Sequence, residues 1–381
     1  MSALAERGGI LMTMHGLSQG GGDRVGVILA NGFAAAGIPT HLALLRDSST
    51  ADKELGQMLH PGVSMSSAGR PLGSRMRELQ RGKAFLRREV EAHRPAIVFA
   101  SSSNMAAVTA HSRPRAQAWP ALVLKLTIPV APPPDRGAFR RFYRRNMFAR
   151  IFKRYDLALT LTEAERHWLI ERYPESEQVF RTVPNAYVTD AMLAEAPAAP
   201  EGPPRLVNAG RMVKQKRHDV LLRAFALSKR KDARLTILGD GPMRGELEQL
   251  AMELGVADRV DMPGYTADVV PELRRSDLFV LSSDYEGLPA VVLEALACNV
   301  PVATTDNFLG AREMLEPLPS CAVVPIQDPE ALASAIDRCL ERSGDPRDLR
   351  PVAEPYRIEA SIAAHIATLS ELVEQRSLAL A

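Results

Sequence analysis

Residues 205–227 read RLVNAGRMVKQKRHDVLLRAFAL and predict a strand, a short basic loop and a helix in succession. The opening run RLVNAG is mostly apolar and ends at a glycine, and the closing segment repeats its apolar residues at helical spacing. Five more strand-like runs follow down the chain, and they read ARLTILG, RVDMPG, DLFVLSS, VPVATT and CAVVPI. Apolar strands separated by helices predict a parallel sheet that is covered on both faces.

The first half of the chain repeats this alternation. Its predicted strands are 10–14, 40–45, 96–100, 121–126 and 157–161, and its predicted helices are 22–36, 74–92, 103–112, 136–154 and 163–173. Between the halves, the Ala- and Pro-rich segment DAMLAEAPAAPEGPPR predicts an interdomain linker.

We therefore expect an α/β protein with two doubly wound, Rossmann-like domains. They would span residues 1–188 and 205–355, with a linker at 189–204 and a last helix within 356–381. Ligands of doubly wound sheets bind beyond the carboxyl ends of the strands, so two facing sheets would place a cleft between the domains.

Composition limits the class of protein. The chain has 381 residues, of which 46% are hydrophobic and 24% charged, as expected for a folded protein of two domains. It lacks a run of about eighteen apolar residues, so no membrane-spanning helix is expected. The segment MSALAERGGILMTMHG predicts a first strand rather than a signal peptide. Cys298, Cys321 and Cys339 lack metal-ligand spacing and predict three buried thiols in a reducing cytoplasm.

The net charge of +2 conceals an asymmetry between the halves. Residues 1–190 carry 26 Lys and Arg against 16 Asp and Glu, while residues 191–381 carry 21 against 29. A basic half and an acidic half suggest two modules with different partners. Anionic lipid, an anionic substrate and nucleic acid all remain open on charge alone.

Two glycine-bearing loops follow predicted strands. Gly20, Gly21 and Gly22 stand where the first strand gives way to a helix. That position suits a phosphate-binding loop, because the helix N-terminus offers free N–H groups, and it suits a plain tight turn equally well. In ILGDGPMRGELEQL, Gly239 and Gly241 would allow a turn and a close approach of backbone to a ligand.

Two cations and two acids carry the strongest chemical signal. Arg211 and Lys216 follow the strand that ends RLVNAG, where they suit a diphosphate; a solvated basic loop is the alternative. The stretch SSDYEGLPAVVLEAL, residues 282–296, places Glu286 at a strand end and Glu294 in the following helix. Seven residues return a helix near the same face, so both carboxylates can point into one cleft. Cations for phosphates and carboxylates for hydroxyls together predict a nucleotide-sugar site.

The combination resembles the retaining glycosyltransferases of the GT-B fold, specifically glycosyltransferase family 4. The matching pieces are GGGDR, AGRMVKQKRHDVLLRAF, LGDGP and SSDYEGLPAVVLEALACNVPVATTD, and the resemblance is strongest at 206–306. It implies that Arg211 and Lys216 bind the donor diphosphate and stabilise the leaving group. It further implies that Glu286 contacts the donor sugar and Glu294 holds the ribose hydroxyls.

The resemblance also implies further donor contacts and a mechanism without a metal. The other residues implied in donor binding are Gly20, Gly21, Gly22, Gly239, Tyr265, Gly287, Leu288 and Pro289. Backbone near Tyr265 would meet the nucleotide base, and the last helix would cross back onto the N-terminal domain. The sequence contains no Asp-x-Asp, so we expect neither a metal nor another cofactor, and the two cations would neutralise the leaving diphosphate. Retention would follow a front-face path.

Two positions depart from the family pattern. Thr127 stands near the usual place of a His that contacts the donor sugar, with Lys125 two residues earlier. We do not assign His15 or His111 to that role, because a lone His is more often structural. The departure suggests an unusual donor: a pentose, or a sugar with extra negative charge near Lys125. Asn299 replaces a usual Gly, and asparagine tolerates the left-handed backbone that the turn needs.

Residues 135–155, DRGAFRRFYRRNMFARIFKRY, contain eight Arg and Lys with one Asp. Apolar side chains recur in this segment at three- and four-residue spacing, and they are Phe139, Phe142, Tyr143, Met147, Ile151 and Tyr155. This pattern is typical of an interfacial membrane helix, and a core-facing helix with a solvated basic side is the alternative. A nucleic-acid partner is not expected, because no recognition motif accompanies the charge. A membrane contact would indicate a cytoplasmic protein at the inner face with a lipid-linked acceptor.

These observations predict a retaining, metal-independent glycosyltransferase that uses a nucleoside-diphosphate sugar and a lipid-linked or glycan acceptor. One alternative is a sugar-nucleotide epimerase or hydrolase of the same fold. The other is a non-catalytic nucleotide-sugar-binding relative, which the absence of the His would permit.

Overall fold

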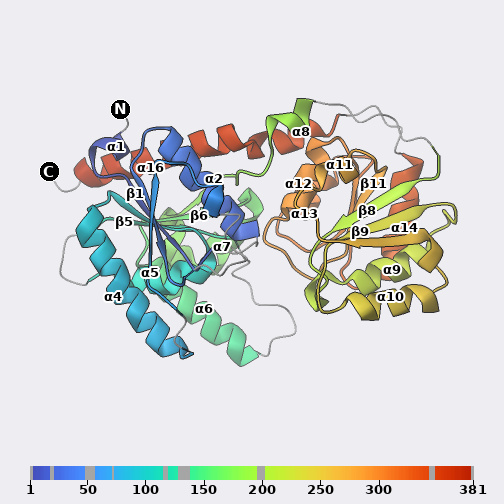
Figure 1. Ribbon diagram of the computed structural model, residues 1–381, viewed down its shortest axis with the longest axis horizontal. Helices are drawn as coiled ribbons and strands as arrows, with labels where there is room; N and C mark the ends of the chain where they lie inside the picture. The colour runs from blue at the N-terminus through green and yellow to red at the C-terminus, as the bar shows by residue number, and fades with distance from the viewer. Residues whose placement is uncertain are drawn as a thin grey trace. The chain divides into compact units, whose positions relative to one another are not determined.

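A computed structural model describes residues 3–17, 21–47, 56–70, 73–114, 119–127, 138–194, 202–342 and 348–378. The chain divides into two compact units (Figure 1). The first consists of Met1–Ala186 and Ile358–Ala381, and the second of Tyr187–Arg357. Each unit is built around its own parallel sheet with helices on both faces, which confirms the predicted α/β fold class.

The sheet of the first unit has the strand order β3-β2-β1-β4-β5-β6-β7. The strands are β1 (Ile10–Met14), β2 (Thr40–Leu44), β3 (Val63–Ser67), β4 (Ile97–Ala100), β5 (Ala121–Lys125), β6 (Leu157–Thr160) and β7 (Phe180–Thr182). All five strands predicted for this half are present, and each is buried on both faces. The sequence did not predict β3 and β7, which form the two edges of the sheet.

Helices cover both faces of this sheet. They are α1 (Ala3–Glu6), α2 (Gly21–Ala35), α4 (Arg75–His93), α5 (Ala106–Ser112), α6 (Ala138–Phe152), α7 (Glu163–Arg172) and α16 (Ile358–Leu378). The C-terminal helix α16 lies against α1 and α2 (Figure 1). A glycine makes its close approach to α2 possible, because a Cβ on Gly32 would lie 2.3 Å from the Cδ1 of Ile362. The hydroxyl of Ser361 also donates to Pro184 O at 2.7 Å. Helix α16 therefore belongs to the first unit.

The sheet of the second unit has the order β10-β9-β8-β11-β12-β13. The strands are β8 (Arg205–Ala209), β9 (Arg234–Leu238), β10 (Val260–Gly264), β11 (Leu278–Leu281), β12 (Val302–Thr305) and β13 (Ala322–Val324). The helices are α8 (Asp190–Ala194), α9 (His218–Leu227), α10 (Arg244–Glu253), α11 (Val270–Leu273), α12 (Ala290–Ala297), α13 (Ala311–Leu315), α14 (Pro329–Glu341) and α15 (Arg350–Ala353). Every strand predicted for this half is present.

The predicted linker, 189–204, begins with a short helix. The sequence shows no strand or long helix pattern there, and α8 has only five residues, which belong to the second unit. The guanidinium of Arg357 pairs with Asp190 at 2.7 Å, and Val188 forms an isolated bridge with Arg357. Alanine is a strong helix former, which fits a short helix at this place.

Helix α6 corrects the expectation of one continuous apolar face. Phe148, Ile151 and Phe152 are buried in the core of the first unit, as is Tyr155 just beyond the helix. The C-terminal half of α6 is therefore a core helix, as the alternative interpretation held. The side chain of Phe139 lies outside the described residues.

The three cysteines are free and buried, as the sequence predicts. Burial raises the pKa of Cys298 and of Cys321 to about 11, and the pKa of Cys339 to about 12. These thiols therefore stay protonated at neutral pH. Within the described ranges, each helix is too short or too polar to traverse a bilayer.

Asn299 adopts a φ of 60° after α12, as the departure from glycine led us to expect. Its side chain also does what glycine cannot, because the Oδ1 atom accepts from Leu349 N at 2.8 Å. We predict that Asn299→Ala lowers the free energy of unfolding by about 1–3 kcal/mol, from left-handed strain and the lost acceptor. Asn299→Gly should lower the free energy of unfolding less than Asn299→Ala does, because glycine tolerates the left-handed backbone and only the acceptor is lost. Urea unfolding midpoints of the two variants test the order, and a less stable Gly variant would contradict it.

Candidate functional site

The second sheet reverses its strand order between β8 and β11. The chain leaves β8 to build β9 and β10 on one side, and later adds β11, β12 and β13 on the other. Strands β8 and β11 pair in parallel through Leu206 with Leu278 and Val207 with Phe279. The loops that follow them, 210–217 and 282–289, therefore emerge side by side at the carboxyl edge of the sheet. Such a switch point is where doubly wound sheets bind ligands.

Hydrogen bonds join these two loops into one structure. The hydroxyl of Ser282 donates to Lys216 O at 3.0 Å, and Asp284 N donates to Gln215 O at 2.9 Å. The side-chain amide of Gln215 donates to Tyr285 O at 2.6 Å. The backbone on either side of the switch point is thus fixed before any ligand binds, which lowers the entropic cost of presenting its charged groups.

Lys216 and Glu286 form an ion pair at this edge. Lys216 Nζ lies 2.7 Å from Glu286 Oε1, and the two side chains are 20% and 13% exposed. Apart from this ion pair, Glu286 Oε1 has no hydrogen-bond donor among the described residues. The carboxylate therefore keeps hydrogen-bonding capacity for a polar ligand.

Arg211, the other predicted cation, follows β8 directly and is exposed. It makes no ion pair with any residue that the structure describes. Its neighbour Met212 is held in place, since Met212 N donates to Asp240 O at 2.9 Å. The guanidinium is thus free to meet an anion while its backbone is anchored.

A glycine permits the third loop of the site to pack closely. Gly239 has a φ of 133°, and a Cβ there would lie only 2.1 Å from Gly210 O. Gly239 N donates to Gly264 O at 2.7 Å. The ends of β8, β9 and β10 are thereby brought together, and Tyr265, at 63% exposure, follows at the rim. A Cβ on Gly241 would likewise lie 2.5 Å from Met212 O.

The second predicted acid lies deeper. Helix α12 begins at Ala290 after Pro289 at its N-cap, so Glu294 falls in the second turn of the helix, within the helix that the sequence predicts. Glu294 is buried, at 6% exposure, and so is Leu288, at 5%. Gly287, in the loop before the helix, is partly exposed.

Sequence reasoning missed Asn307, which supports Glu286. Asn307 is buried and follows β12, the next strand beyond β11. Its carbonyl accepts from Glu286 N at 2.6 Å, and its amide donates to the hydroxyls of Thr304 and Thr305 at 2.9 and 3.0 Å. The signal was present in VPVATTDN, because a polar residue directly after a buried strand lies at the same edge as Glu286.

The predicted residues of the first unit are partly brought together. Gly20 lies outside the described residues, and Gly21 begins α2. A Cβ on Gly22 would lie 4.0 Å from Thr127 Oγ1. Thr127 N donates a hydrogen bond to Ser103 Oγ at 3.3 Å. The glycine turn and Thr127 are therefore neighbours beyond the ends of β1 and β5.

Lys125 does not occupy the place that the sequence suggested. The residue is 0% exposed, and its Nζ donates to Val183 O at 2.5 Å inside the first unit. Burial lowers the pKa of Lys125 to about 7, and burial raises the pKa of the nearby Glu165 to about 7. Lys125 is therefore a core residue in this structure, and its placement speaks against the expected contact with a donor sugar. His15 is exposed, and the Nδ1 of His111 lies 2.6 Å from Ala107 O.

Comparison with known proteins finds similarity to glycosyltransferases, the class that the sequence resembles. Two family models match adjacent parts of the chain: Glycosyltransferase Family 4 over residues 19–191, and Glycosyl transferases group 1 over residues 192–354. The crystal structure of Anabaena Alr3699/HepE in complex with UDP covers 97% of this chain and 100% of its own, with a TM-score of 0.72 at 16% identity. That likeness concerns the fold, which is the GT-B architecture of two Rossmann-like domains.

Two curated relatives match shorter stretches. An uncharacterised glycosyltransferase of Methanocaldococcus jannaschii is 31% identical over 176 residues, which is 44% of this chain and 43% of that protein. The N-acetylgalactosamine-N,N'-diacetylbacillosaminyl-diphospho-undecaprenol 4-alpha-N-acetylgalactosaminyltransferase of Campylobacter jejuni is 36% identical over 109 residues, 29% and 30% of the two chains. The chain thus spans less than half the length of these relatives. With its two family models end to end, the chain belongs to the family-4, group 1 glycosyltransferases.

Proposed function

We propose that this chain transfers a sugar from a nucleoside-diphosphate donor to an acceptor, with retention at the anomeric carbon and without a metal ion. The observation that carries the proposal is the Lys216–Glu286 pair, 2.7 Å apart at the switch point of the second sheet. A cation for a diphosphate and a carboxylate for sugar hydroxyls stand there together. Family membership supports the activity, and the UDP bound by Alr3699/HepE supports a nucleotide donor.

The cationic residues would bind the diphosphate of the donor, and the acidic residues would bind its hydroxyl groups. Arg211 and Lys216 would neutralise the charge that develops on the leaving diphosphate, which a metal does in other enzymes. Glu286 would accept hydrogen bonds from the donor sugar, while Tyr265 and the backbone beside it would meet the base. We also propose the ribose role for Glu294; because it is buried, the ribose hydroxyls would have to reach the first turns of α12.

A panel of nucleotide sugars tests the activity directly. The purified chain is incubated with each donor, with and without candidate acceptors, and nucleoside diphosphate release is followed together with the product. Transfer should persist in EDTA, and NMR should show the anomeric configuration of the donor kept in the product. Diphosphate release that never depends on an acceptor would instead indicate a hydrolase or epimerase. Nucleotide binding without any turnover would indicate a non-catalytic relative.

Of the two residues that suggested an unusual donor sugar, Lys125 and Thr127, only Thr127 still supports that hypothesis. The hypothesis of an extra negative charge on the sugar rested on Lys125, which is buried in the core of the first unit. Thr127 remains where relatives usually have His, and it lies beside the glycine turn. We therefore propose that pentose donors be screened beside hexoses, with Thr127 as the contact that distinguishes them.

Gly239 offers a sharp test of the proposed nucleotide site. We predict that Gly239→Ala weakens UDP binding about tenfold or more, a loss of roughly 1.4 kcal/mol for each factor of ten. The reason is that the new Cβ would lie 2.1 Å from Gly210 O and would push apart the loops after β8 and β9. Gly245→Ala is the matched control, because a Cβ on Gly245 meets nothing within 4 Å. Calorimetric titration measures both variants, and equal affinities would contradict the prediction.

We further propose that the first turns of α6 contact a membrane that carries the acceptor. Phe142 and Tyr143 are 66% and 65% exposed, although Phe148, Ile151 and Phe152 later in the same helix are buried. Arg144 and Arg145 follow them directly, so aromatic and cationic groups are presented together. This composition suits the headgroup region of an anionic bilayer, and the diphospho-undecaprenol in the name of the Campylobacter relative supports a lipid-linked acceptor.

Flotation with liposomes tests this contact. We predict that the wild-type chain floats with phosphatidylglycerol vesicles at low salt, and that Phe142→Ser/Tyr143→Ser reduces the floated fraction severalfold. Salt should also reduce it, because it screens the arginines. Met76→Ser is the control, since Met76 is 64% exposed on a helix of the same unit. Failure of the wild-type chain to float even at low salt would remove the proposal.

A further inference from the structure

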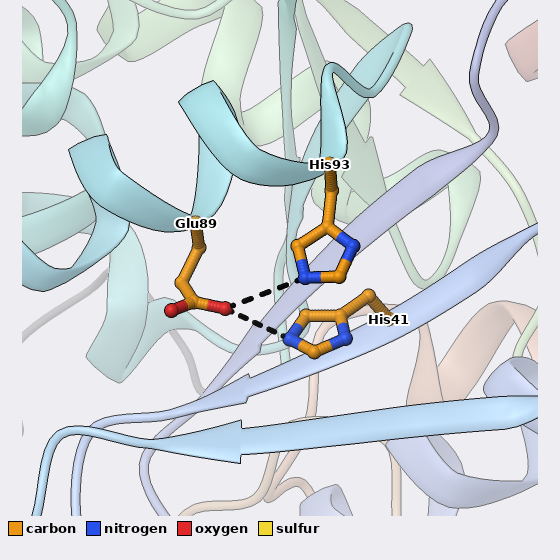
Figure 2. A group of neighbouring side chains, drawn as sticks. All are labelled: His41, Glu89 and His93. Carbon is orange, nitrogen blue, oxygen red and sulfur yellow. Dashed lines mark ion pairs between the residues drawn. The ribbon is translucent and has the colours of Figure 1, made fainter.

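Three side chains of the types that ligate metals meet near the edge of the first sheet, away from the residues discussed so far. His41 lies on β2, while Glu89 and His93 lie one turn apart near the end of α4 (Figure 2). His41 Nε2 lies 3.0 Å from Glu89 Oε2, and His93 Nε2 lies 3.6 Å from the same oxygen. One ligand atom from each of the three residues lies within 4.8 Å of the other two.

These separations fit a small metal ion. Zinc holds nitrogen and oxygen ligands at roughly 2.0–2.1 Å in a tetrahedron, which places neighbouring ligand atoms about 3.3 Å apart. The two observed separations, 3.0 and 3.6 Å, lie on either side of that value. The two stacked rings would have to turn so that both Nε2 lone pairs point at the ion, and the three side chains would then occupy three corners of a tetrahedron, with the fourth open to water.

Serine hydroxyls on β3 surround the cluster as supporting groups. His41 Nδ1 lies 2.7 Å from Ser64 Oγ, and the hydroxyl of Ser66 donates to Glu89 Oε2 at 2.6 Å. Ser66 Oγ also lies 2.8 Å from His41 Nε2. If Nδ1 carries the proton and donates to Ser64, then Nε2 presents its lone pair toward Glu89. A metal-bound histidine typically makes a supporting hydrogen bond of this kind through its other nitrogen.

The two imidazole rings of the cluster lie against each other. They are stacked, with centroids 3.8 Å apart and an interplanar angle of 25°. Their ligand atoms and that of Glu89 therefore already share one small volume, within 4.8 Å of one another.

The cluster is also accessible from one side. The side chains of His41 and Glu89 are 8% and 16% exposed, while that of His93 is 38% exposed. An ion can therefore enter past His93 and meet two largely buried ligands. Imidazole and carboxylate ligands suit zinc and similar divalent transition metals better than calcium or magnesium.

We propose that His41, Glu89 and His93 form a three-ligand site for Zn²⁺ or a similar divalent transition metal. Water would complete the coordination. The ion ties the last turn of α4 to β2, next to the exposed edge strand β3, and its role is structural. None of the residues proposed for donor binding lies on β2 or α4.

Metal binding to the full-length chain, freed of any histidine tag, tests the site. After chelation and dialysis, calorimetry should show one equivalent of Zn²⁺ bound tightly, Co²⁺ should give the visible absorption of a tetrahedral complex, and Zn²⁺ should raise the Tm. His93→Gln and Glu89→Gln should each weaken Zn²⁺ binding about 100-fold or more and abolish the Tm shift. His93 is the most exposed ligand, so its variant should fold, and the Tm without metal verifies this.

His167→Gln serves as the matched control, because His167 is an exposed helical histidine of the same unit. It should bind Zn²⁺ as the wild type does. The proposal is overturned if the wild type binds no stoichiometric Zn²⁺, or if His93→Gln binds it with unchanged affinity. The cluster would then be a hydrogen-bonded contact between α4, β2 and β3. Chelation should lower the Tm without abolishing sugar transfer, which keeps this test separate from that of the proposed function.

Discussion

Replacing Lys216 with methionine should reduce sugar transfer by about 10²–10³-fold while leaving the protein folded. Methionine keeps the length of the side chain and removes only the ammonium, which lies 2.7 Å from Glu286 Oε1 at the switch point. Without a metal, this ammonium and Arg211 would be the groups that stabilise the leaving diphosphate. The loss should appear mainly in kcat, because the charge on the leaving group grows toward the transition state.

Lys214→Met provides the matched control for this variant. Lys214 stands in the same short 3-10 turn, Lys214–Lys216, but its side chain is exposed and makes no ion pair among the described residues. It should retain nearly full activity. Glu286→Gln, which removes the partner charge with little change in shape, should also lower kcat. Equal losses in the Lys214 and Lys216 variants, or none in either, would contradict the role assigned to Lys216.

The fold could be predicted from the sequence because most strands are buried on both faces, although the predicted edge strand β10 is an exception. Such strands appear as short apolar runs, and all eleven runs identified in the sequence correspond to strands. The two missed strands lack that signal for a physical reason. The edge strand β3 reads VSMSS and is largely exposed, and β7 has only three residues, Phe180–Thr182. Pairing with a neighbour makes them strands, and a single sequence does not show pairing.

The residues of the candidate site that directly follow strands could be predicted from the sequence. Arg211, Lys216 and Glu286 could be identified because parallel strands bring their carboxyl ends to one edge. The contacts that position them were not predictable, because Gln215 and Asn307 act through hydrogen bonds to the backbone of other loops. The pairing of His41 with Glu89 and His93 was likewise hidden, since β2 and α4 are separated in the chain by β3.

Lys125 shows where sequence reasoning failed. Its position near a strand end suggested a ligand contact, but its surroundings come from distant elements. Burial raises the pKa of Glu165 on α7, and Lys125 is a charged neighbour of His365 on α16, whose pKa is lowered chiefly by burial. Helix α16 comes from the far end of the chain and packs onto the first unit. Lys125 is thus buried among β7-adjacent backbone at Val183, α7 and α16, which a strand-end position in the sequence does not reveal.

Because Lys125 is buried in the core, we expect it to contribute to the free energy of unfolding, and that contribution should depend on pH. Lys125→Ala should lower the free energy of unfolding by about 2–5 kcal/mol, because it leaves a cavity and removes the donor to Val183 O. Lys125→Met should keep much more of the stability, since an apolar side chain of similar length often replaces a buried charge well. Thermal and urea unfolding measure the two variants against the wild type.

The pH dependence follows from the lowered pKa of Lys125. Burial lowers this pKa from 10.5 to about 7, so between these values the unfolded chain binds a proton that the folded chain does not. The contribution of Lys125 to stability therefore increases as pH rises from 7 toward 10.5 and is lost as pH falls through 7. Lys125→Met lacks this contribution, so its Tm relative to the wild type should fall as pH rises across that window. A Met variant with wild-type stability at every pH but a raised KM for the donor would overturn this assignment, and would return Lys125 to the donor site.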